Sequence, residues 1–202
     1  MDSVKVSSPR GLSQPRSLPP TLPCTLLPRS QVAGAKKVQQ ELSRPGVTER
    51  FLSAEDAVRL RDVYAGQWGL DDLDDAETAR VVADAVARPG GYVLKPQREG
   101  GGNNLYGDEL RAKLVAGGRS LAQFILMERI QPPEHDVVLV RRGQARSAQA
   151  LSELGVYSVR VAVGGKIVLD KPAGHLLRTK LASSDEGGVN AGYAVLDSPW
   201  LT

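Results

Sequence analysis

The order in which helical and strand-like patterns follow each other is what most constrains the fold of this chain. Apolar residues recur at helical spacing in the first half, whereas continuous or alternating apolar runs dominate from residue 124 onward. The clearest strand pattern is 156–163, which breaks at Gly164-Gly165 and resumes over 166–170, as in a β-hairpin. Helices that come before an antiparallel sheet predict the α+β class.

Local signals place the other elements. The expected helices lie at 36–42, 53–65, 75–87 and 107–115. The second helix begins with the capping pair Ser53 and Asp56, and the third should bury one stripe of small apolar residues, Ala79, Val82 and Val86. A short strand is expected at 91–94, and continuous apolar runs typical of buried strands lie at 124–127 and 137–140.

The chain is long enough for one domain with its own core. Its 202 residues are 41% hydrophobic, and we expect the domain to occupy 31–202. Residues 1–30 hold six of the 13 prolines and six serines, which predicts a disordered head. An organelle transit peptide is the alternative, because this segment is rich in Ser and Arg and poor in acids.

The net charge of +3 resides in the head rather than in the domain. Residues 1–32 carry four basic residues and one acid, so the other 170 residues hold 22 basic and 22 acidic groups. A neutral domain with 4% aromatic residues lacks the basic surface and the stacking platform that nucleic-acid binding uses. We therefore expect no nucleic-acid partner.

The cysteine content and the hydropathy of the chain indicate which cellular compartment suits it. The single cysteine, Cys24, excludes an internal disulfide framework and a thiolate zinc cluster. No apolar run approaches the roughly 18–20 residues that a membrane span requires, and no secretory signal opens the sequence. We expect a cytoplasmic protein without a membrane partner, with organelle targeting by the head as the alternative.

A glycine-rich segment at 95–107 is the most informative motif. Consecutive glycines let the backbone approach an anion closely and direct successive N–H groups at it. Lys95 and Arg98 add positive charge beside the glycines, and Glu99 is an oxygen ligand that suits Mg²⁺. The segment is neither a Walker loop nor a Rossmann fingerprint. It is interpreted as a phosphate cradle, with a mobile surface loop as the alternative.

Charged residues also gather near the end of the chain. Arg178 and Lys180 lie two residues apart, on the same side of an extended strand, and Asp185 and Glu186 precede a Gly-Gly pair. Such a group suits a metal–nucleotide site, although a solvated face or a salt bridge is the alternative. Glu153, in an apolar context, is either a paired or ligand-bound carboxylate or an ordinary edge-strand glutamate.

Six blocks of sequence, in order, resemble one family. They are 35–46, 95–107, 125–128, 152–155, 175–180 and 187–189. These blocks are similar to eukaryotic-type glutathione synthetase, an ATP-grasp ligase, and the similarity extends from Gln31 to the end of the chain. It implies a partial ATP-grasp domain with a mostly antiparallel sheet and flanking helices. These residues correspond to about the last third of the family's chain.

The resemblance also implies a reaction and a set of binding residues. Family members ligate γ-glutamylcysteine to glycine through an acyl phosphate and use ATP and Mg²⁺. Glu99 would bind magnesium, and Arg178, Val189 and Asn190 would contact the substrate. The ATP-binding residues would be Lys95, Pro96, Gln97, Arg98, Gly100, Gly101, Gly102, Asn103, Asn104, Tyr106, Met127, Glu128, Arg129, Ile130, Glu153, Lys180 and Glu186.

The family's pattern also bears on what this chain does alone. Family members form homodimers, and their dimer surface, further magnesium ligands and another ATP-binding lysine are expected N-terminal to Gln31. Arg129 stands where a lysine is usual, and Glu186 where an aspartate is usual. The alternative to a ligase is a truncated, non-catalytic product with a partial nucleotide site or none.

Overall fold

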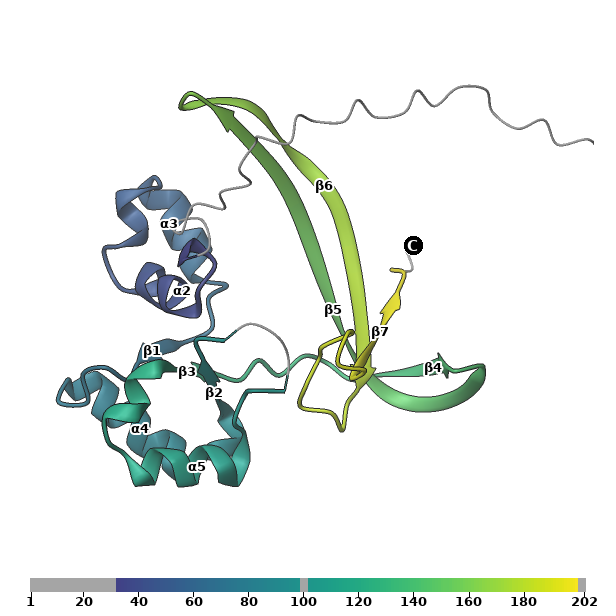
Figure 1. Ribbon diagram of the computed structural model, residues 1–202, viewed down its shortest axis with the longest axis horizontal. Coiled ribbons are helices and arrows are strands. Elements are labelled where there is room, and N and C mark those ends of the chain that lie inside the picture. Colours follow the sequence, from purple (N-terminus) through teal and green to yellow (C-terminus); the bar gives the residue numbers. More distant parts are fainter. Residues whose placement is uncertain (1–31, 99–101, 200–202) are drawn as a thin grey trace, which may run out of the picture.

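Two antiparallel sheets organise the chain (Figure 1). The first has the strand order β1-β3-β2 and consists of β1 (Gln67–Gly69), β2 (Tyr92–Pro96) and β3 (Phe124–Glu128). The second has four strands in sequence order, β4 (His135–Arg141), β5 (Gln144–Val163), β6 (Lys166–Leu181) and β7 (Ala194–Asp197). The α+β class with antiparallel sheets is therefore confirmed.

The computed structural model describes residues 32–98 and 102–199. The head expected at 1–30 and three expected site residues, Glu99, Gly100 and Gly101, lie outside the described residues. None of the helices in the described ranges combines the length and apolarity needed to cross a membrane.

The helices precede the long strands, as the sequence predicts. They are α2 (Lys36–Ser43), α3 (Ala54–Arg61), α4 (Ala76–Ala87) and α5 (Gly107–Ala116), with the 3₁₀ helices η1 (Thr48–Arg50), η2 (Pro89–Gly91) and η3 (Arg119–Gln123). Ser53 caps α3 by accepting a hydrogen bond from the Asp56 N–H at 3.1 Å. The expectation that this helix reaches Ala65 is wrong. Val58 and Val63 are exposed, so no packed face stabilises a further turn.

The core lies between α4, α5 and the three-stranded sheet. Its buried members are Leu70, Val81, Ala85, Leu94, Leu110, Leu114, Leu121 and Leu126. On α4 the buried stripe is Thr78, Val81 and Ala85, which corrects the expected one. Ala79 is exposed, and Val82 and Val86 pack at the edge of the core. Because α4 has apolar residues on two adjacent stripes, contact with the sheet rather than periodicity decides which stripe is buried.

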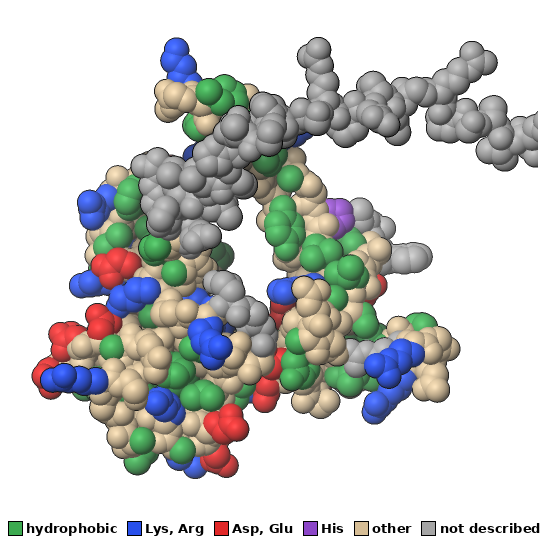
Figure 2. All heavy atoms as spheres, in the orientation of Figure 1, with side chains coloured by type: hydrophobic (Ala, Val, Ile, Leu, Met, Phe, Trp, Pro, Cys, Tyr) green, Lys and Arg blue, Asp and Glu red, His purple; other side chains and the backbone are tan. Residues whose placement is uncertain are grey.

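The expected β-hairpin is formed by β5 and β6. Gly164 and Gly165, at φ of 55° and 78°, make the turn, and two successive positive φ values are what a tight turn of matching twist requires. The ribbon rises from its base and curves toward the side of α2 and α3 in this view, and it pairs with β4 and β7 near its base (Figure 1). Apolar side chains lie exposed along it in Figure 2, and Val156 is 76% exposed.

Strand β4 corrects a second expectation. Its apolar run at 137–140 was expected to be buried, but Val138 and Val140 are 65% and 63% exposed. Within the described residues the strand lies at the edge of the second sheet and pairs with β5 alone. A continuous apolar run thus indicates a strand without showing that both of its faces are covered.

A chain of hydrogen bonds crosses the four strands of the second sheet. Thr179, which is fully buried, donates to Asp197 Oδ2 at 2.9 Å, and its oxygen lies 2.8 Å from Ser152 Oγ. Because Thr179 has one hydroxyl proton, Ser152 must be the donor to Thr179. His135 Nε2, 3.2 Å from Ser152 Oγ, then donates to Ser152. This chain fixes the strands behind the face that carries Glu153 and Arg178.

Replacing Thr179 by valine is expected to lower the free energy of unfolding by about 1–3 kcal/mol. The change keeps the shape but removes the donor to Asp197 and the acceptor for Ser152. Thr179→Ser keeps both hydrogen bonds and is the matched control. Urea unfolding measures both variants and the parent protein, and a Thr179→Val variant as stable as the parent would contradict the role of the hydroxyl.

Candidate functional site

The glycine-rich loop is closed at its base by main-chain hydrogen bonds. Leu94 N donates to Leu105 O at 3.0 Å, and Leu105 N donates to Leu94 O at 2.9 Å. Gln97 N donates to Gln123 O at 3.1 Å, which holds the start of the loop beside η3. The segment therefore leaves β2 and returns to it, with both ends anchored beside the strand that carries Lys95.

Helix α2 contributes a lysine that the sequence analysis did not assign. Lys36 Nζ donates to Arg98 O at 2.9 Å, and Lys37 N donates to Gln97 Oε1 at 3.1 Å. These bonds join residues about sixty positions apart, and the charge of Lys36 acts on Lys95. Lys36 lies in the family-like block 35–46, and this position is the sequence feature that could have identified it. The resemblance instead predicts the other ATP-binding lysine N-terminal to Gln31.

Burial and charge act together on Lys95. Loss of solvent at this half-buried side chain, followed by the positive charge of Lys36, lowers the pKa of the Lys95 ammonium. Glu153 and Glu186 oppose that shift, so both carboxylates are near enough to act on Lys95. An anionic ligand at this position would favour the charged lysine.

The opposite side of the site comes from the loop between β6 and β7. Asn104 Nδ2 donates to Glu186 Oε1 at 3.2 Å and to the Tyr106 hydroxyl oxygen at 3.3 Å. Arg129 pairs with Asp185 at 2.6 Å, and its guanidinium lies 5.7 Å from the centre of the Tyr106 ring. Burial, and then the charge of Glu186, raise the pKa of the Tyr106 hydroxyl. The end of the glycine loop and the β6–β7 loop are therefore in contact.

Strands β5 and β6 supply a charged pair on the same side. Glu153 and Arg178 are register partners, and Arg178 Nη2 lies 2.6 Å from Glu153 Oε2. Their side chains are 44% and 43% exposed, so the pair is accessible to ligands. Lys180 lies two residues further on and donates to Asp185 O at 3.0 Å. Sequence reasoning left open whether Glu153 is paired, and it is.

Other expected site residues are placed differently. The Glu128 carboxylate accepts from Gly66 N at 3.2 Å, and the Gln97 amide faces α2, so both side chains hold the structure together. Ile130 is exposed beyond the end of β3, and Pro96 is buried. The remaining described residues of the expected set lie in the strand and in the two loops: Met127, Gly102, Asn103, Val189 and Asn190.

The described residues contain no group of three or more His, Cys, Asp or Glu arranged to hold a metal ion. The expected magnesium ligand, Glu99, lies outside them. Within the described site, Glu186 and Glu153 are the carboxylates that act on Lys95.

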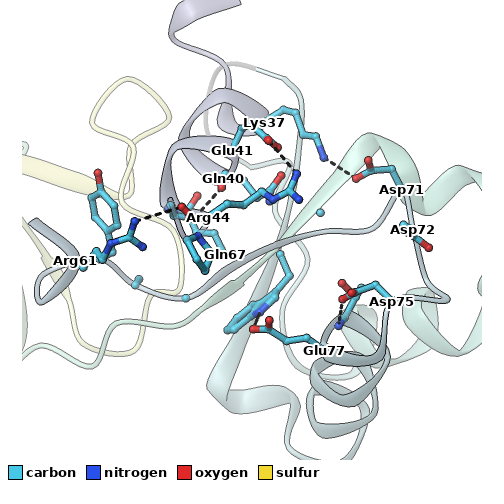
Figure 3. A pocket seen from close by; sticks show the side chains of 18 residues that line it. Lys37, Gln40, Glu41, Arg44, Arg61, Gln67, Asp71, Asp72, Asp75 and Glu77 are labelled. Atoms are coloured by element: carbon cyan, nitrogen blue, oxygen red, sulfur yellow. Dashed lines mark hydrogen bonds and ion pairs between the residues drawn. The ribbon is translucent and has the colours of Figure 1, made fainter. Parts of the chain in front are cut away.

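Two cavities lie in the described part of the structure, and neither encloses the whole site. One, of about 670 Å³, lies between α2, β1 and the start of α4, and none of the expected site residues lines it (Figure 3). Its charges are largely satisfied, as by the pair of Lys37 and Asp71, and that bond holds the pKa of the Asp71 carboxyl below its usual value. The other, of about 980 Å³, includes Lys180 and Val189 in its lining. The site is thus defined by its converging side chains rather than by a closed cavity.

Comparison with known proteins places the chain in a family. The family model for the eukaryotic glutathione synthase ATP-binding domain matches residues 5–201. The chain is 48% identical over 175 residues to the chloroplastic glutathione synthetase of Arabidopsis thaliana, covering 84% of this chain and 31% of that protein. It is 48% identical over 176 residues to the glutathione synthetase of Homo sapiens, covering 85% of this chain and 37% of that protein.

A solved structure has the same fold. A glutathione synthetase-like effector from Globodera pallida, in its apo form, aligns with a TM-score of 0.61 and 24% identity, over 85% of this chain and 35% of that one. The chain spans about a third of the length of the two relatives above. Since the family model matches nearly all of its residues, the chain belongs to the eukaryotic glutathione synthase family and corresponds to the ATP-binding domain.

Proposed function

We propose that this chain forms the ATP-binding part of a ligase that joins γ-glutamylcysteine to glycine. The observation that carries the proposal is the convergence of Lys36 and Lys95 at the base of the glycine loop. Two cations at the base of a glycine-rich segment suit a polyphosphate. The glutathione synthetase names of its relatives support the choice of substrates.

Each side of the site has a proposed role in nucleotide binding. Lys36, Lys95 and the loop residues Gly100, Gly101, Gly102, Asn103 and Asn104 would hold the phosphates, with Tyr106 beside them. Gly102 has a φ of 82°, a conformation that a side chain disfavours. Residues 127–130 would flank the adenine, and Glu153, Lys180 and Glu186 would contact the nucleoside.

The phosphate chemistry includes magnesium, which Glu99 is proposed to bind. Bound ATP supplies the phosphoryl group that activates the substrate carboxylate. The residues of this chain hold the phosphates in place and counter their charge, which is how most catalysis of phosphoryl transfer arises. Arg178 is proposed to bind a substrate carboxylate, with Val189 and Asn190 beside it, because its guanidinium suits two-point contact with a carboxylate.

The proposed setting of the chain is the cytoplasm, and its proposed ligands are small molecules. Homodimer formation remains a prediction of the family resemblance. The competing proposal is a non-catalytic chain with a partial nucleotide site. Nucleotide binding and turnover, measured separately, distinguish the two.

Replacing Lys95 by glutamine is expected to weaken Mg–ATP binding about ten- to hundredfold, the range for a lost hydrogen bond to a charged group. Lys166→Gln, in the hairpin turn far from the loop, is the matched control. Isothermal titration calorimetry measures both affinities. Equal affinity of Lys95→Gln and the parent protein would contradict the phosphate role.

The lowered pKa of Lys95 gives this experiment a second readout. Phosphate stabilises the charged amine and raises its pKa, so at alkaline pH below the ordinary lysine value of 10.5 binding should take up protons. Affinity should therefore fall as the pH rises through the pKa of Lys95. Calorimetry in buffers of different ionisation enthalpy measures the uptake, which Lys95→Gln should reduce and Lys166→Gln should not.

A further inference from the structure

Two residues proposed to bind different ligands are bonded to each other. Arg178, proposed for the substrate carboxylate, donates from Nη2 to Glu153, which is proposed for the nucleoside, at 2.6 Å. The bond joins neighbouring strands at a shared register position, so the main chain holds the two residues opposite each other. The substrate arginine is thus occupied by a carboxylate of its own chain.

Both oxygens of Glu153 have close neighbours. Oε2 accepts from Arg178, whereas Oε1 lies against Gly187, where an added Cβ would be 3.2 Å from it. A side chain at position 187 would therefore crowd this oxygen, and glycine avoids that contact. A nucleoside donor that binds Oε2 therefore competes with Arg178 for that oxygen.

We propose that the Glu153–Arg178 pair makes substrate binding depend on the nucleotide, an inference that rests on the proposed function. A substrate carboxylate that takes Arg178 leaves Glu153 without its donor. A nucleoside hydroxyl or amine that donates to Glu153 replaces that lost bond. Each ligand therefore strengthens the binding of the other, and by linkage the two effects are equal.

The exposure of the pair sets the size of the effect. Ion pairs exposed to this degree contribute about 0.2–1 kcal/mol, which corresponds to roughly 1.4- to fivefold in an equilibrium constant. We expect saturating Mg–ADP to raise the affinity for γ-glutamylcysteine about two- to fivefold within that range. The reciprocal titration should give the same factor.

The ribbon provides a matched control pair. Arg160 and Asp170 also face each other across β5 and β6, with Arg160 Nη2 2.6 Å from Asp170 Oδ2, but they are remote from the glycine loop. Asp170→Asn and Glu153→Gln each replace a paired carboxylate by an amide of similar size. Only Glu153→Gln should abolish the effect of Mg–ADP on the affinity for γ-glutamylcysteine. The same variant should bind γ-glutamylcysteine more tightly without nucleotide, because Arg178 is released.

NMR titration of γ-glutamylcysteine, followed through the side-chain N–H signal of Arg178, measures such affinities even when they are weak. The coupling is supported by a two- to fivefold gain with Mg–ADP in the parent and in Asp170→Asn, and by no gain in Glu153→Gln. The coupling is overturned if Mg–ADP leaves the dipeptide affinity of the parent unchanged, or if Glu153→Gln shows the same gain as the parent. It is also overturned if the Arg178 signal does not respond to the dipeptide. If Mg–ADP itself fails to bind, the proposed function fails, which calorimetry shows separately.

Discussion

Replacing Leu126 by alanine is expected to lower the free energy of unfolding by about 2–5 kcal/mol. Leu126 is 0% exposed and lies on β3, the central strand of the first sheet, where its register partners are Trp68 and Leu94. Truncation removes buried apolar surface and leaves a cavity at the junction of the sheet with the helices. Such losses approach the whole stability of a domain of this size.

Leu196→Ala is the matched control for this experiment. Leu196 is 62% exposed on β7, so its truncation should change the free energy of unfolding by less than about 0.5 kcal/mol. Urea denaturation followed by circular dichroism gives both values. If the two substitutions lower the free energy of unfolding equally, the packed layer between the first sheet and α4 and α5 is not the main source of stability.

The sequence predicts the turns and element types of this fold well, and it predicts poorly which faces of those elements are buried. Gly164-Gly165 marks the hairpin because a tight turn depends on backbone conformation at two adjacent residues. The buried stripe of α4 was predicted wrongly, because which stripe is buried depends on a sheet formed by distant residues. The same limit applies to β4, where coverage depends on elements elsewhere in the chain.

The partner of Glu153 shows why the site was only partly predictable. An unbulged hairpin from the turn at Val163 and Lys166 would place Leu176 opposite Glu153, but two register shifts along the ribbon place Arg178 there. One such shift would move a side chain to the other face, and two restore it. Spacing alone therefore identified the charged residues and missed their pairing.

Sequence patterns also do not predict contacts between residues that are far apart in the chain. The hydrogen bond from Lys36 to Arg98 joins a helix to a loop in a different part of the chain, and only the three-dimensional arrangement brings them together. The sequence nevertheless predicts a site at the glycine loop and the charged strand residues. Their chemistry depends on residue type and local spacing, which the sequence displays directly.

A polypeptide that consists of residues 1–202 alone is expected to form no ADP above background when γ-glutamylcysteine and glycine are both present. Acyl-phosphate chemistry depends on positioning and on electrostatic stabilisation of the transferred group, and small misplacements cost orders of magnitude in rate. The known relatives are about three times longer than the part matched here. In this chain Glu153 and Arg178 remain 44% and 43% exposed to solvent.

Solvent access of this kind weakens the electrostatic interactions that the reaction requires and leaves the acyl phosphate open to hydrolysis. A coupled ADP assay on the purified chain tests the expectation, after light scattering has shown that exposed ribbon residues such as Val156 have not caused association. Arg178→Ala is the control, because it removes the proposed substrate contact and leaves the lysines at the glycine loop in place. Robust glycine-dependent turnover that Arg178→Ala abolishes would show that these 202 residues suffice for ligation. ADP binding without turnover would show that the isolated chain binds nucleotide but does not catalyse ligation.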